Sequence, residues 1–379
     1  MNVYFDNAAT TPIDSRVIEE MLPYWETHYG NPSSIHSLGR KAKSAIEQAR
    51  KKVADLLHTS PSEIFFTSGG TESDNTALIS SVETSGLKHI ITSPLEHHAV
   101  LHTVEHLEKS GKIKLHLLDV DEKGNIDQDQ LEILLKEYPK SIVSLMHGNN
   151  EIGNLIDIQN IGELCKEHQS LFHSDTVQTM GHYPLHLGDL PVDFVAGSAH
   201  KFHGPKGVGV LYINHNQKIH PFIQGGSQER NMRGGTENVA GIVGLAKALE
   251  LSYATMEEDH KMLDHLKYYF IEQLKSRVPG VSFNGLSADL EKSVSKTLNV
   301  SFPPGDHNEM MLFNLDINGI CASGGSACSS GSSVGSHVLS ALNSDPTRGA
   351  VRFSFSRFNT LEEVDYVVNK VVEIVPVSA

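Results

Sequence analysis

Two short apolar segments of this chain end in groups that can react, an acid after the first and a lysine after the second. Asp175 follows the segment 170–173, and Lys201 follows the segment 192–196. If both segments are neighbouring strands of one sheet, these two groups lie together at its edge. A carboxylate for a ring nitrogen and an amine for an aldehyde are what pyridoxal phosphate requires of a protein. The pair therefore predicts an enzyme of amino-acid chemistry.

The segments around this pair alternate between strand-like and helix-like patterns. We expect strands at 64–67, 89–92, 112–120, 141–146, 170–173, 192–196 and 209–213, and helices at 72–84, 97–109, 127–137 and 158–168. Such alternation is typical of an α/β fold with a mainly parallel sheet that is covered by helices on both faces.

The pattern changes past residue 255. We expect a charge-rich helix, two strands and a last helix, at 256–277, 298–302, 351–355 and 361–375. The chain therefore divides into a large α/β domain, 15–255, and a smaller α+β domain, 1–14 with 256–379. The smaller domain carries a segment of low complexity, 322–336, with four glycines and seven serines.

Polar residues stand at one end of five predicted strands: Gly70 and Thr71, Glu96 and His97, Asn149 and Asn150, Asp175, and Lys201. The sequence Gly-Gly-Thr-Glu at 69–72 joins a strand to a helix, where backbone N–H groups and the helix N-terminus attract an anion. We expect a phosphate there, with the Thr71 hydroxyl as an additional donor. A glycine turn with a helix cap is the alternative. The chain has no Walker lysine and no G-x-G-x-x-G pattern, so nucleotide binding is less favoured.

Each polar group has a role in this hypothesis. Lys201 forms the Schiff base with the cofactor aldehyde, and Asp175 keeps the ring nitrogen protonated. Gln178 donates to or accepts from the ring hydroxyl, and His97 stacks on the ring and acts as acid and base. Taken singly, Lys201 could be a surface lysine, Asp175 a helix cap and His97 an exposed first-turn residue.

Cys328 lies in the Gly/Ser-rich segment 322–336. Such a composition predicts a flexible tether, so its thiol can serve both a buried site and the surface. The alternative is a linker that happens to contain a small residue. Cys165 and Cys321 lie in apolar runs, where packing is the expected role.

Two further features suit an amino-acid substrate. Arg352 is a cation inside an apolar strand, which predicts a clamp on a substrate carboxylate, although pairing with a structural acid is the alternative. The loop 30–34, which contains Asn31, is expected to line the substrate entrance.

Composition excludes several classes of protein. The net charge of −15 argues against a nucleic-acid or anionic-membrane partner, and three cysteines in 379 residues suit a reducing compartment. No signal peptide is visible at the start and no apolar run approaches the length of a membrane span. We therefore expect a cytoplasmic protein.

Twenty-two histidines raise a metal alternative. His98, His102 and His106 are four residues apart and share one helix face, a spacing that can hold a metal. No H-E-x-x-H pattern and no nearby acid completes the set, so a solvated histidine face is preferred.

Several ordered segments match a known family almost from end to end, at 4–12, 30–34, 67–75, 149–153, 198–201, 232–238 and 325–328. On these segments the chain resembles the cysteine desulfurases, within the class V aminotransferase group, of the branch that serves iron–sulfur cluster assembly and nitrogen fixation. The resemblance implies a fold-type I enzyme of pyridoxal phosphate, with a seven-stranded, mainly parallel sheet, that acts as a homodimer.

The resemblance also implies roles for individual residues. Lys201 binds the cofactor covalently, and His97 stacks on its ring. Asn150 and Arg352 hold the substrate, and Cys328 forms the persulfide. The implied phosphate binders are Gly70, Thr71, Ser198, His200 and, from the other subunit, Thr236.

The implied activity converts L-cysteine to L-alanine and moves the sulfur to Cys328. A sulfur-acceptor or iron–sulfur scaffold protein would receive it, and in some relatives this cysteine also helps to hold a nascent cluster. The nearest alternatives are a selenocysteine lyase and an aminotransferase, although a plain aminotransferase needs no tethered thiol. A non-catalytic assembly platform and a metal hydrolase are the more distant ones.

Overall fold

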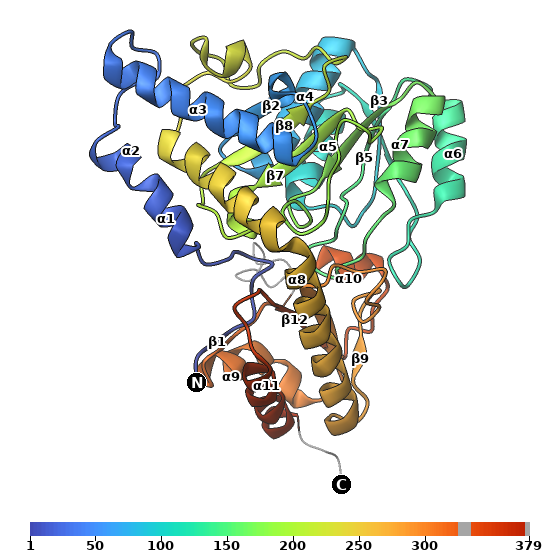
Figure 1. Cartoon of the computed structure of the whole chain (residues 1–379). Coiled ribbons are helices and arrows are strands. Elements are labelled where there is room, and N and C mark those ends of the chain that lie inside the picture. The colour runs from blue at the N-terminus through green and yellow to red at the C-terminus, as the bar shows by residue number, and fades with distance from the viewer. Residues whose placement is uncertain (325–334, 376–379) are drawn as a thin grey trace.

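A twisted seven-stranded sheet forms the larger lobe of the computed structural model, which describes residues 1–324 and 335–375 (Figure 1). The strand order is β2-β8-β7-β6-β5-β3-β4. The bounds are β2 (Ile64–Thr67), β3 (His89–Thr92), β4 (Lys114–Leu117), β5 (Ile142–Ser144), β6 (Leu171–Asp175), β7 (Phe194–Ser198) and β8 (Gly209–Ile213). Only β8 runs in the direction opposite to the other six strands of this sheet, so the predicted α/β fold with a mainly parallel sheet is confirmed.

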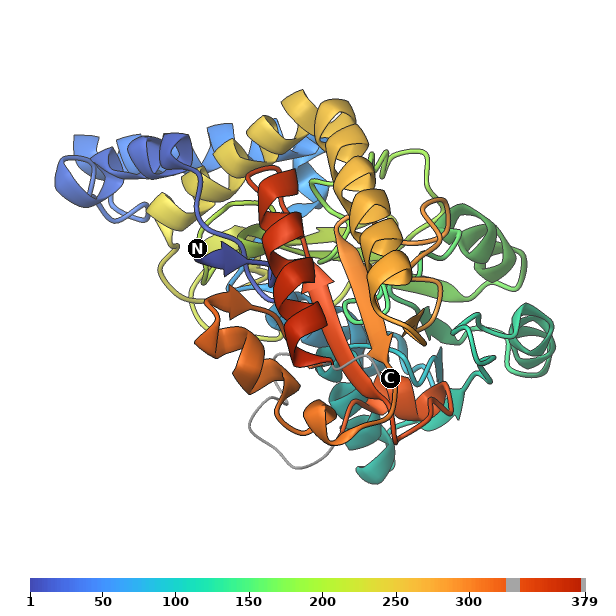
Figure 2. The same cartoon turned by 90° about the horizontal axis from the view of Figure 1, so that it is seen from below.

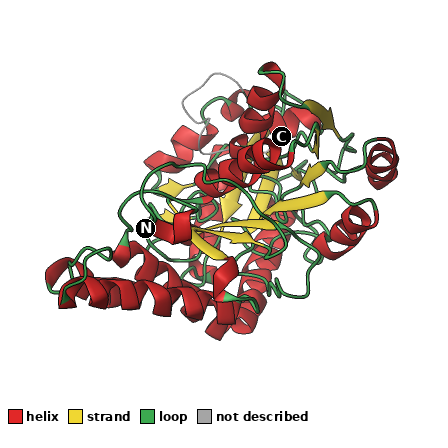
Figure 3. Cartoon of the chain, turned by 90° about the horizontal axis from the view of Figure 1, so that it is seen from above, coloured by secondary structure: helices red, strands yellow, loops and turns green. Residues whose placement is uncertain are grey.

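The strands of this sheet are buried on both faces, as their apolar runs predict. Alternate residues face opposite layers: Ile90 packs with α4 (Gly70–Ser85) and α5 (His98–Lys109), whereas Ile91 faces the opposite layer. That opposite layer contains α3 (Ser37–Leu56), α7 (Ile158–Glu167) and the first half of α8 (Val239–Arg277). Figure 3 shows helices on both sides of the strands, and α6 (Gln128–Glu137) lies beside α7 in Figure 1.

The smaller lobe is built on an antiparallel sheet of order β12-β10-β9, with bounds β9 (Ser282–Phe283), β10 (Thr297–Phe302) and β12 (Gly349–Ser354). Helix α11 (Leu361–Ile374) and the second half of α8 cover it side by side (Figure 2). Strand β1 (Val3–Tyr4) pairs with β11 (Ile320–Cys321), next to α9 (Met311–Ile317). The N-terminal residues thus join the smaller lobe, as the proposed division of the chain requires.

Helix α8 corrects one sequence expectation. It begins at Val239 and not at 256, because Asn238 caps it by accepting a hydrogen bond from the Gly241 N–H group. Its first half buries Ile242 and Leu245 in the larger lobe, and its second half buries other residues in the smaller one. The boundary at residue 255 therefore falls inside one continuous helix, and the division into domains remains a proposal.

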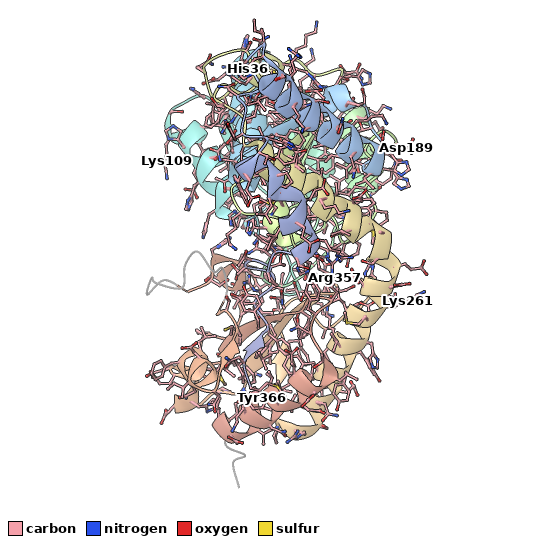
Figure 4. All side chains as sticks on the ribbon, turned by 60° about the vertical axis from the view of Figure 1, so that its left-hand side comes forward. His36, Lys109, Asp189, Lys261, Arg357 and Tyr366 are labelled. Carbon is pink, nitrogen blue, oxygen red and sulfur yellow. The ribbon has the colours of Figure 1, made fainter. Side chains whose placement is uncertain are left out.

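Arg357 links the two lobes near the middle of α8 (Figure 4). Its guanidinium lies 2.8 Å from Asp14 Oδ2 and 3.4 Å from Asp259 Oδ2. Asp14 also caps α1 (Ser15–Met21) by accepting a hydrogen bond from the Arg16 N–H group. One buried carboxylate thus joins the start of the larger lobe to the end of the smaller one.

The remaining elements are short: α2 (Pro23–Glu26), α10 (His337–Ala341) and the 3-10 turns η1 (Pro61–Glu63), η2 (Ala199–Lys201), η3 (Gln228–Asn231) and η4 (Asp306–Asn308). Among the described residues, α8 alone is long and apolar enough to cross a membrane, and 56% of its most apolar window is buried within the fold. Such burial is what a core helix shows.

Candidate active site

A cavity of about 210 Å³ lies where the carboxyl ends of the strands meet the N-terminal segment. Strands β2, β3, β5, β6 and β7 all point their carboxyl ends to this edge, because β8 reverses direction between β2 and β7. Most of the predicted site residues line the cavity: Gly70, Thr71, His97, Asn150, Asp175, Gln178, Ser198, His200, Lys201 and Arg352. The structure therefore gathers residues that are up to 282 positions apart in the chain, from Gly70 to Arg352.

Lys201 lies in the 3-10 turn that follows β7. Its Nζ donates hydrogen bonds to the carbonyl oxygens of Ala8, at 2.6 Å, and Ala9, at 2.7 Å. The N-terminal segment is fixed over the turn by a further backbone bond from Thr11 to His200, at 2.9 Å. The amine is thus held in the cavity wall by backbone that comes from the far end of the chain.

Asp175 is the last residue of β6, two residues beyond the predicted end of that strand. Its side chain is buried, and Oδ1 accepts a hydrogen bond of 2.8 Å from the Val177 N–H group. Burial, and then the charge of Asp74, raise the pKa of Asp175 to about 7. A protonated ring nitrogen in the cavity would favour the ionised carboxylate and lower that pKa again.

His97 caps α5, and its Nδ1 accepts a hydrogen bond of 3.1 Å from the Ala99 N–H group. Burial, and then the nearby Lys201 ammonium, lower the pKa of His97 to about 4. The imidazole is therefore neutral at pH 7, and its proton lies on Nε2 because Nδ1 is an acceptor. His97, which lines the cavity, therefore offers it a neutral N–H group as a hydrogen-bond donor.

The N-terminus of α4 forms the expected anion site. Gly69 has a φ of +155°, and no side chain caps the helix there. A Cβ atom on Gly70 would lie 2.6 Å from Val177 Cγ2, so only glycine fits between the helix and that side chain. Uncapped N–H groups and the helix dipole remain to bind an anion beside Thr71.

Arg352 is buried in β12, and the pairing with a structural acid that its sequence allowed is present. Its Nη2 lies 2.9 Å from Asp6 Oδ1, and its Nη1 donates to the Asn150 carbonyl oxygen at 2.8 Å. Its Nε is buried and forms no hydrogen bond to any described residue. The guanidinium is thus anchored by a structural acid, and a clamp on a substrate carboxylate stays a prediction.

Gln178 offers a second polar atom without a partner in the described part of the chain. Its Nε2 donates to the Ala8 carbonyl oxygen at 3.0 Å, and its buried Oε1 forms no hydrogen bond. An anion site, a carboxylate, a lysine and an unsatisfied amide around one cavity match the phosphate, ring nitrogen, aldehyde and ring hydroxyl of pyridoxal phosphate. The residues present therefore fit this cofactor.

Two predicted residues of the described chain lie elsewhere. Asn31 is exposed before α3, and Thr236 is exposed beside a separate cavity that Arg233 also lines. Cys328 lies outside the described residues. One chain alone therefore does not bring Asn31 or Thr236 to the cavity, and their roles stay predictions.

The histidine alternative finds no support in residues 1–324 and 335–375, where no three His, Cys, Asp or Glu side chains are placed to hold a metal. The rings of His98 and His102 stack on each other at a centroid distance of 4.6 Å. His337 lies against His98 at 4.4 Å. The three imidazole rings therefore pack against one another.

Sequence reasoning missed several residues of the cavity wall. Asp74 has a signal, since it follows Gly70 by four positions and therefore shares its helix face. Ala8 and Ala9 carry no such signal in the sequence, because only the tertiary fold brings the N-terminal segment across the strand ends.

The fold and the cavity define an α/β protein with a lysine, an acid and an anion site at one sheet edge. Residues 3–367 match the model of the family described as aminotransferase class-V. The cysteine desulfurase IscS of Dictyoglomus turgidum is 45% identical over 378 residues, which cover 98% of this chain and 94% of the relative. The solved structure of a NifS-like protein has a TM-score of 0.91 at 41% identity, with 99% of each chain covered.

A further solved structure, described as SspA in complex with cysteine, has a TM-score of 0.82 at 33% identity, with 94% of this chain and all of that one covered. The chain belongs to the aminotransferase class-V family and, within it, to the cysteine desulfurases.

Proposed function

We propose that the chain is a pyridoxal-phosphate-dependent cysteine desulfurase that converts L-cysteine to L-alanine and passes the sulfur to Cys328. The observation that carries this proposal is one cavity with Lys201, Asp175 and the uncapped N-terminus of α4 in its wall. The IscS relatives of similar length support the desulfurase activity, and the SspA complex supports cysteine as the substrate.

Pyridoxal phosphate, when bound, supplies an electron sink for the pair of electrons that the substrate α-carbon releases. The phosphate would be held by Gly70 and Thr71 with Ser198 and His200 beside them. His200 is neutral, because burial and then Lys201 lower its pKa to about 4, so it serves as a hydrogen-bond partner and not as a cation.

The remaining residues hold the ring and the substrate. Asp175 would pair with the ring nitrogen, Gln178 with the ring hydroxyl, and His97 would lie against the ring face. The amine of Lys201, once the substrate amine has replaced it, removes the proton from the substrate α-carbon. His97, which is neutral in the free protein, would act as an acid only after it has taken up a proton, which it would then return to the substrate as the sulfur leaves.

Sulfur transfer requires the thiolate form of Cys328. The thiolate attacks the substrate sulfur, the carbon–sulfur bond breaks, and its electron pair returns to the substrate carbon, which a proton then converts to the methyl group of alanine. The product on the protein is a persulfide. Because the thiol must ionise, the rate of transfer falls as the pH drops below the thiol pKa.

We expect Arg352→Met to raise KM for L-cysteine by about 100-fold, because a charge-assisted hydrogen bond to the substrate carboxylate is lost. The effect on kcat is smaller, since the reacting atoms keep their partners. Initial rates over a range of cysteine concentrations measure both constants.

Arg348→Met is the matched control. This arginine bonds Ser301 and Gly280 just before β12 and lies outside the cavity, so KM stays at the wild-type value. An unchanged KM for L-cysteine in Arg352→Met would show that Arg352 does not bind the substrate carboxylate. Melting temperatures of both variants show whether loss of the Asp6 ion pair loosens the N-terminal segment.

The partners follow from the same proposal. We infer a homodimer, in which the exposed Thr236 serves the cavity of the other subunit, and a sulfur-acceptor or iron–sulfur scaffold protein. Arg233, three residues before Thr236, pairs with the buried Glu72 at 3.0 Å and so fixes this segment to α4. A free thiol at Cys328 requires a reducing compartment, which the cytoplasm provides.

The test is the product balance of the protein loaded with pyridoxal phosphate. With L-cysteine and a reductant, we expect equal amounts of alanine and sulfide. Formation of pyruvate, or of an amino-group transfer product, contradicts the desulfurase and favours another reaction of the class. A rate with selenocysteine that far exceeds the rate with cysteine favours the selenocysteine lyase.

A further inference from the structure

Asp74 is a buried acid in the cavity wall that the chemistry above does not use. It lies on α4, one turn after Gly70, and its side chain is 1% exposed. Its one ion-pair partner among the described residues is His173, with Oδ1 3.3 Å from Nε2. Neither of these two atoms forms a hydrogen bond to any described residue, so the contact between them is one of proximity. Asp74 therefore faces an imidazole and no lysine or arginine.

His173 does not supply the missing positive charge. Its side chain is fully buried in β6, and its Nδ1 lies 2.8 Å from Ser144 Oγ. Burial lowers the pKa of His173 to about 4, so the ring is neutral at pH 7. The tautomer that accepts the Ser144 hydroxyl at Nδ1 presents a neutral N–H group to Asp74. The pair is thus a neutral ring beside an acid.

Two more acids share this region. Asp175 follows His173 on β6, and Glu96, which is 1% exposed, precedes α5. Glu96 Oε1 accepts a hydrogen bond of 2.8 Å from the Met146 N–H group, whereas its Oε2 has no partner in the described residues. Burial holds the pKa of Glu96 well above its usual range, and the charges of Asp175 and Asp74 raise it further.

The other groups packed on α4 do not supply enough positive charge to balance the three carboxylates of Asp74, Asp175 and Glu96. Strands β2, β7 and β8 present no charged side chain to it. Helix α5 meets α4 through Ala99 and Thr103, which bond Asn75. Among the described residues, His173 and then Lys201 lower the pKa of Asp175, no lysine or arginine acts on Asp74, and Arg233 is already paired with Glu72. Like charges buried this close cannot all ionise at neutral pH.

We propose that Asp74 is a positioning residue which, as a neutral carboxylic acid, leaves Asp175 the single ionised acid in the cavity wall. The contacts favour this order of ionisation, because Asp175 accepts the Val177 N–H group and lies in the field of Lys201. Asp74 has neither, and burial raises its pKa to about 8.

The benefit of a neutral Asp74 to the reaction rests on the proposed function. A second negative charge beside Asp175 would oppose the electron pair that the cofactor ring accepts and would repel the substrate carboxylate. A neutral Asp74 avoids both effects at pH 7, and its ionisation above that pH introduces them.

The test is Asp74→Asn, which keeps the shape of the side chain and removes its titration. At pH 7 we expect kcat/KM within about threefold of wild type, since both side chains are neutral there. Between pH 7 and pH 9 we expect the ratio of variant to wild type to rise by about threefold or more, because Asp74 ionises in the wild type alone. A loss of more than about tenfold at pH 7, or a ratio that does not change with pH, overturns the proposal.

Asp264→Asn is the matched control. This residue of α8 also has a buried carboxylate oxygen without a partner among the described residues, but it lies outside the cavity. We expect the ratio of kcat/KM of Asp264→Asn to that of the wild type to stay constant between pH 7 and pH 9. A rise as large as that of Asp74→Asn would mean that the effect is not specific to the cavity, and it overturns the proposal.

A second readout needs no cofactor. The pKa of Asp74 in the folded protein is about 8, whereas that of a solvent-exposed aspartate is 3.8, so the wild type loses stability relative to a neutral residue as the pH rises from about 4 to about 8. The melting temperature of cofactor-free Asp74→Asn, relative to that of the cofactor-free wild type, should therefore increase as the pH rises from about 4 to about 8. A constant difference contradicts a neutral Asp74. A protein that binds no pyridoxal phosphate refutes the proposed function and leaves this result standing.

If Asp74→Asn does not fold, the variant Glu96→Gln decides the question. Its infrared spectrum at pH 7 should keep a carbonyl band from a buried protonated acid, because Asp74 supplies one. Absence of that band overturns the proposal.

Discussion

Lys201→Ala lowers alanine formation from L-cysteine by at least about 1,000-fold, if the amine both binds the cofactor and removes the α-proton. The cofactor then binds without a covalent bond, so borohydride reduction fixes none of it to the protein, and denaturation after reduction releases all of it. Rates of alanine formation and the absorbance of the reduced, denatured protein measure the two effects. The cavity position of Lys201, with its Nζ on the Ala8 and Ala9 carbonyl oxygens, is the structural basis of this expectation.

Two further variants separate the role of the Lys201 amine in the reaction from its role in holding the N-terminal segment. Lys201→Arg keeps the positive charge and can still donate to the same carbonyl oxygens, yet it cannot form the bond to the aldehyde, so it should be as inactive as Lys201→Ala. Lys261→Ala, at an exposed position of α8 (Figure 4), should retain full activity. Activity in Lys201→Arg would mean that the alanine variant fails only through its loosened N-terminal segment.

Cys328→Ser should abolish turnover with L-cysteine, by at least about 100-fold, because the hydroxyl is not ionised near neutral pH and cannot accept the sulfur. Cysteine should still change the visible spectrum of the loaded protein, since none of the residues that bind substrate in the proposal is altered. The persulfide on the wild-type protein is detected by mass spectrometry as one added sulfur atom. Alanine formation at the normal rate in Cys328→Ser shows that the assigned role is wrong.

Cys321→Ser is the control for this thiol. Cys321 is exposed and seven positions earlier in the chain, and partial desolvation of its thiol with the charges of Asp316 and Asp6 raises its pKa. It is therefore a poorer thiolate than an ordinary cysteine, and its loss should leave turnover unchanged. A large loss here would indicate a second sulfur carrier.

The sheet could be predicted because its strands are short apolar runs separated by turn residues and helices. The predictions for β2, β3 and β8 agree with the structure residue for residue. Strands β6 and β7 each extend two residues further than expected, so that Asp175 and Ser198 end their strands. The site could be predicted in part for the same reason, since parallel strands bring the residues at their carboxyl ends together.

The parts that could not be predicted depend on contacts between distant segments. The ion pair of Arg352 with Asp6 joins residues 346 positions apart, and no local pattern indicates it. The sequence does not indicate the start of α8, because residues 239–246 are all apolar or glycine and show no helical alternation of apolar and polar positions. Helix α3 was not proposed either, although its apolar residues recur at helical spacing.

Borohydride reduction of the protein loaded with pyridoxal phosphate, followed by peptide mass spectrometry, tests the central claim most directly. The account predicts a single pyridoxyl adduct on the peptide that contains Lys201. Lys267 and Lys296 are the informative rivals, because burial lowers the pKa of both amines and leaves them nucleophilic, yet neither lines the cavity. An adduct on either of them, or no adduct in a protein that binds the cofactor, contradicts the account.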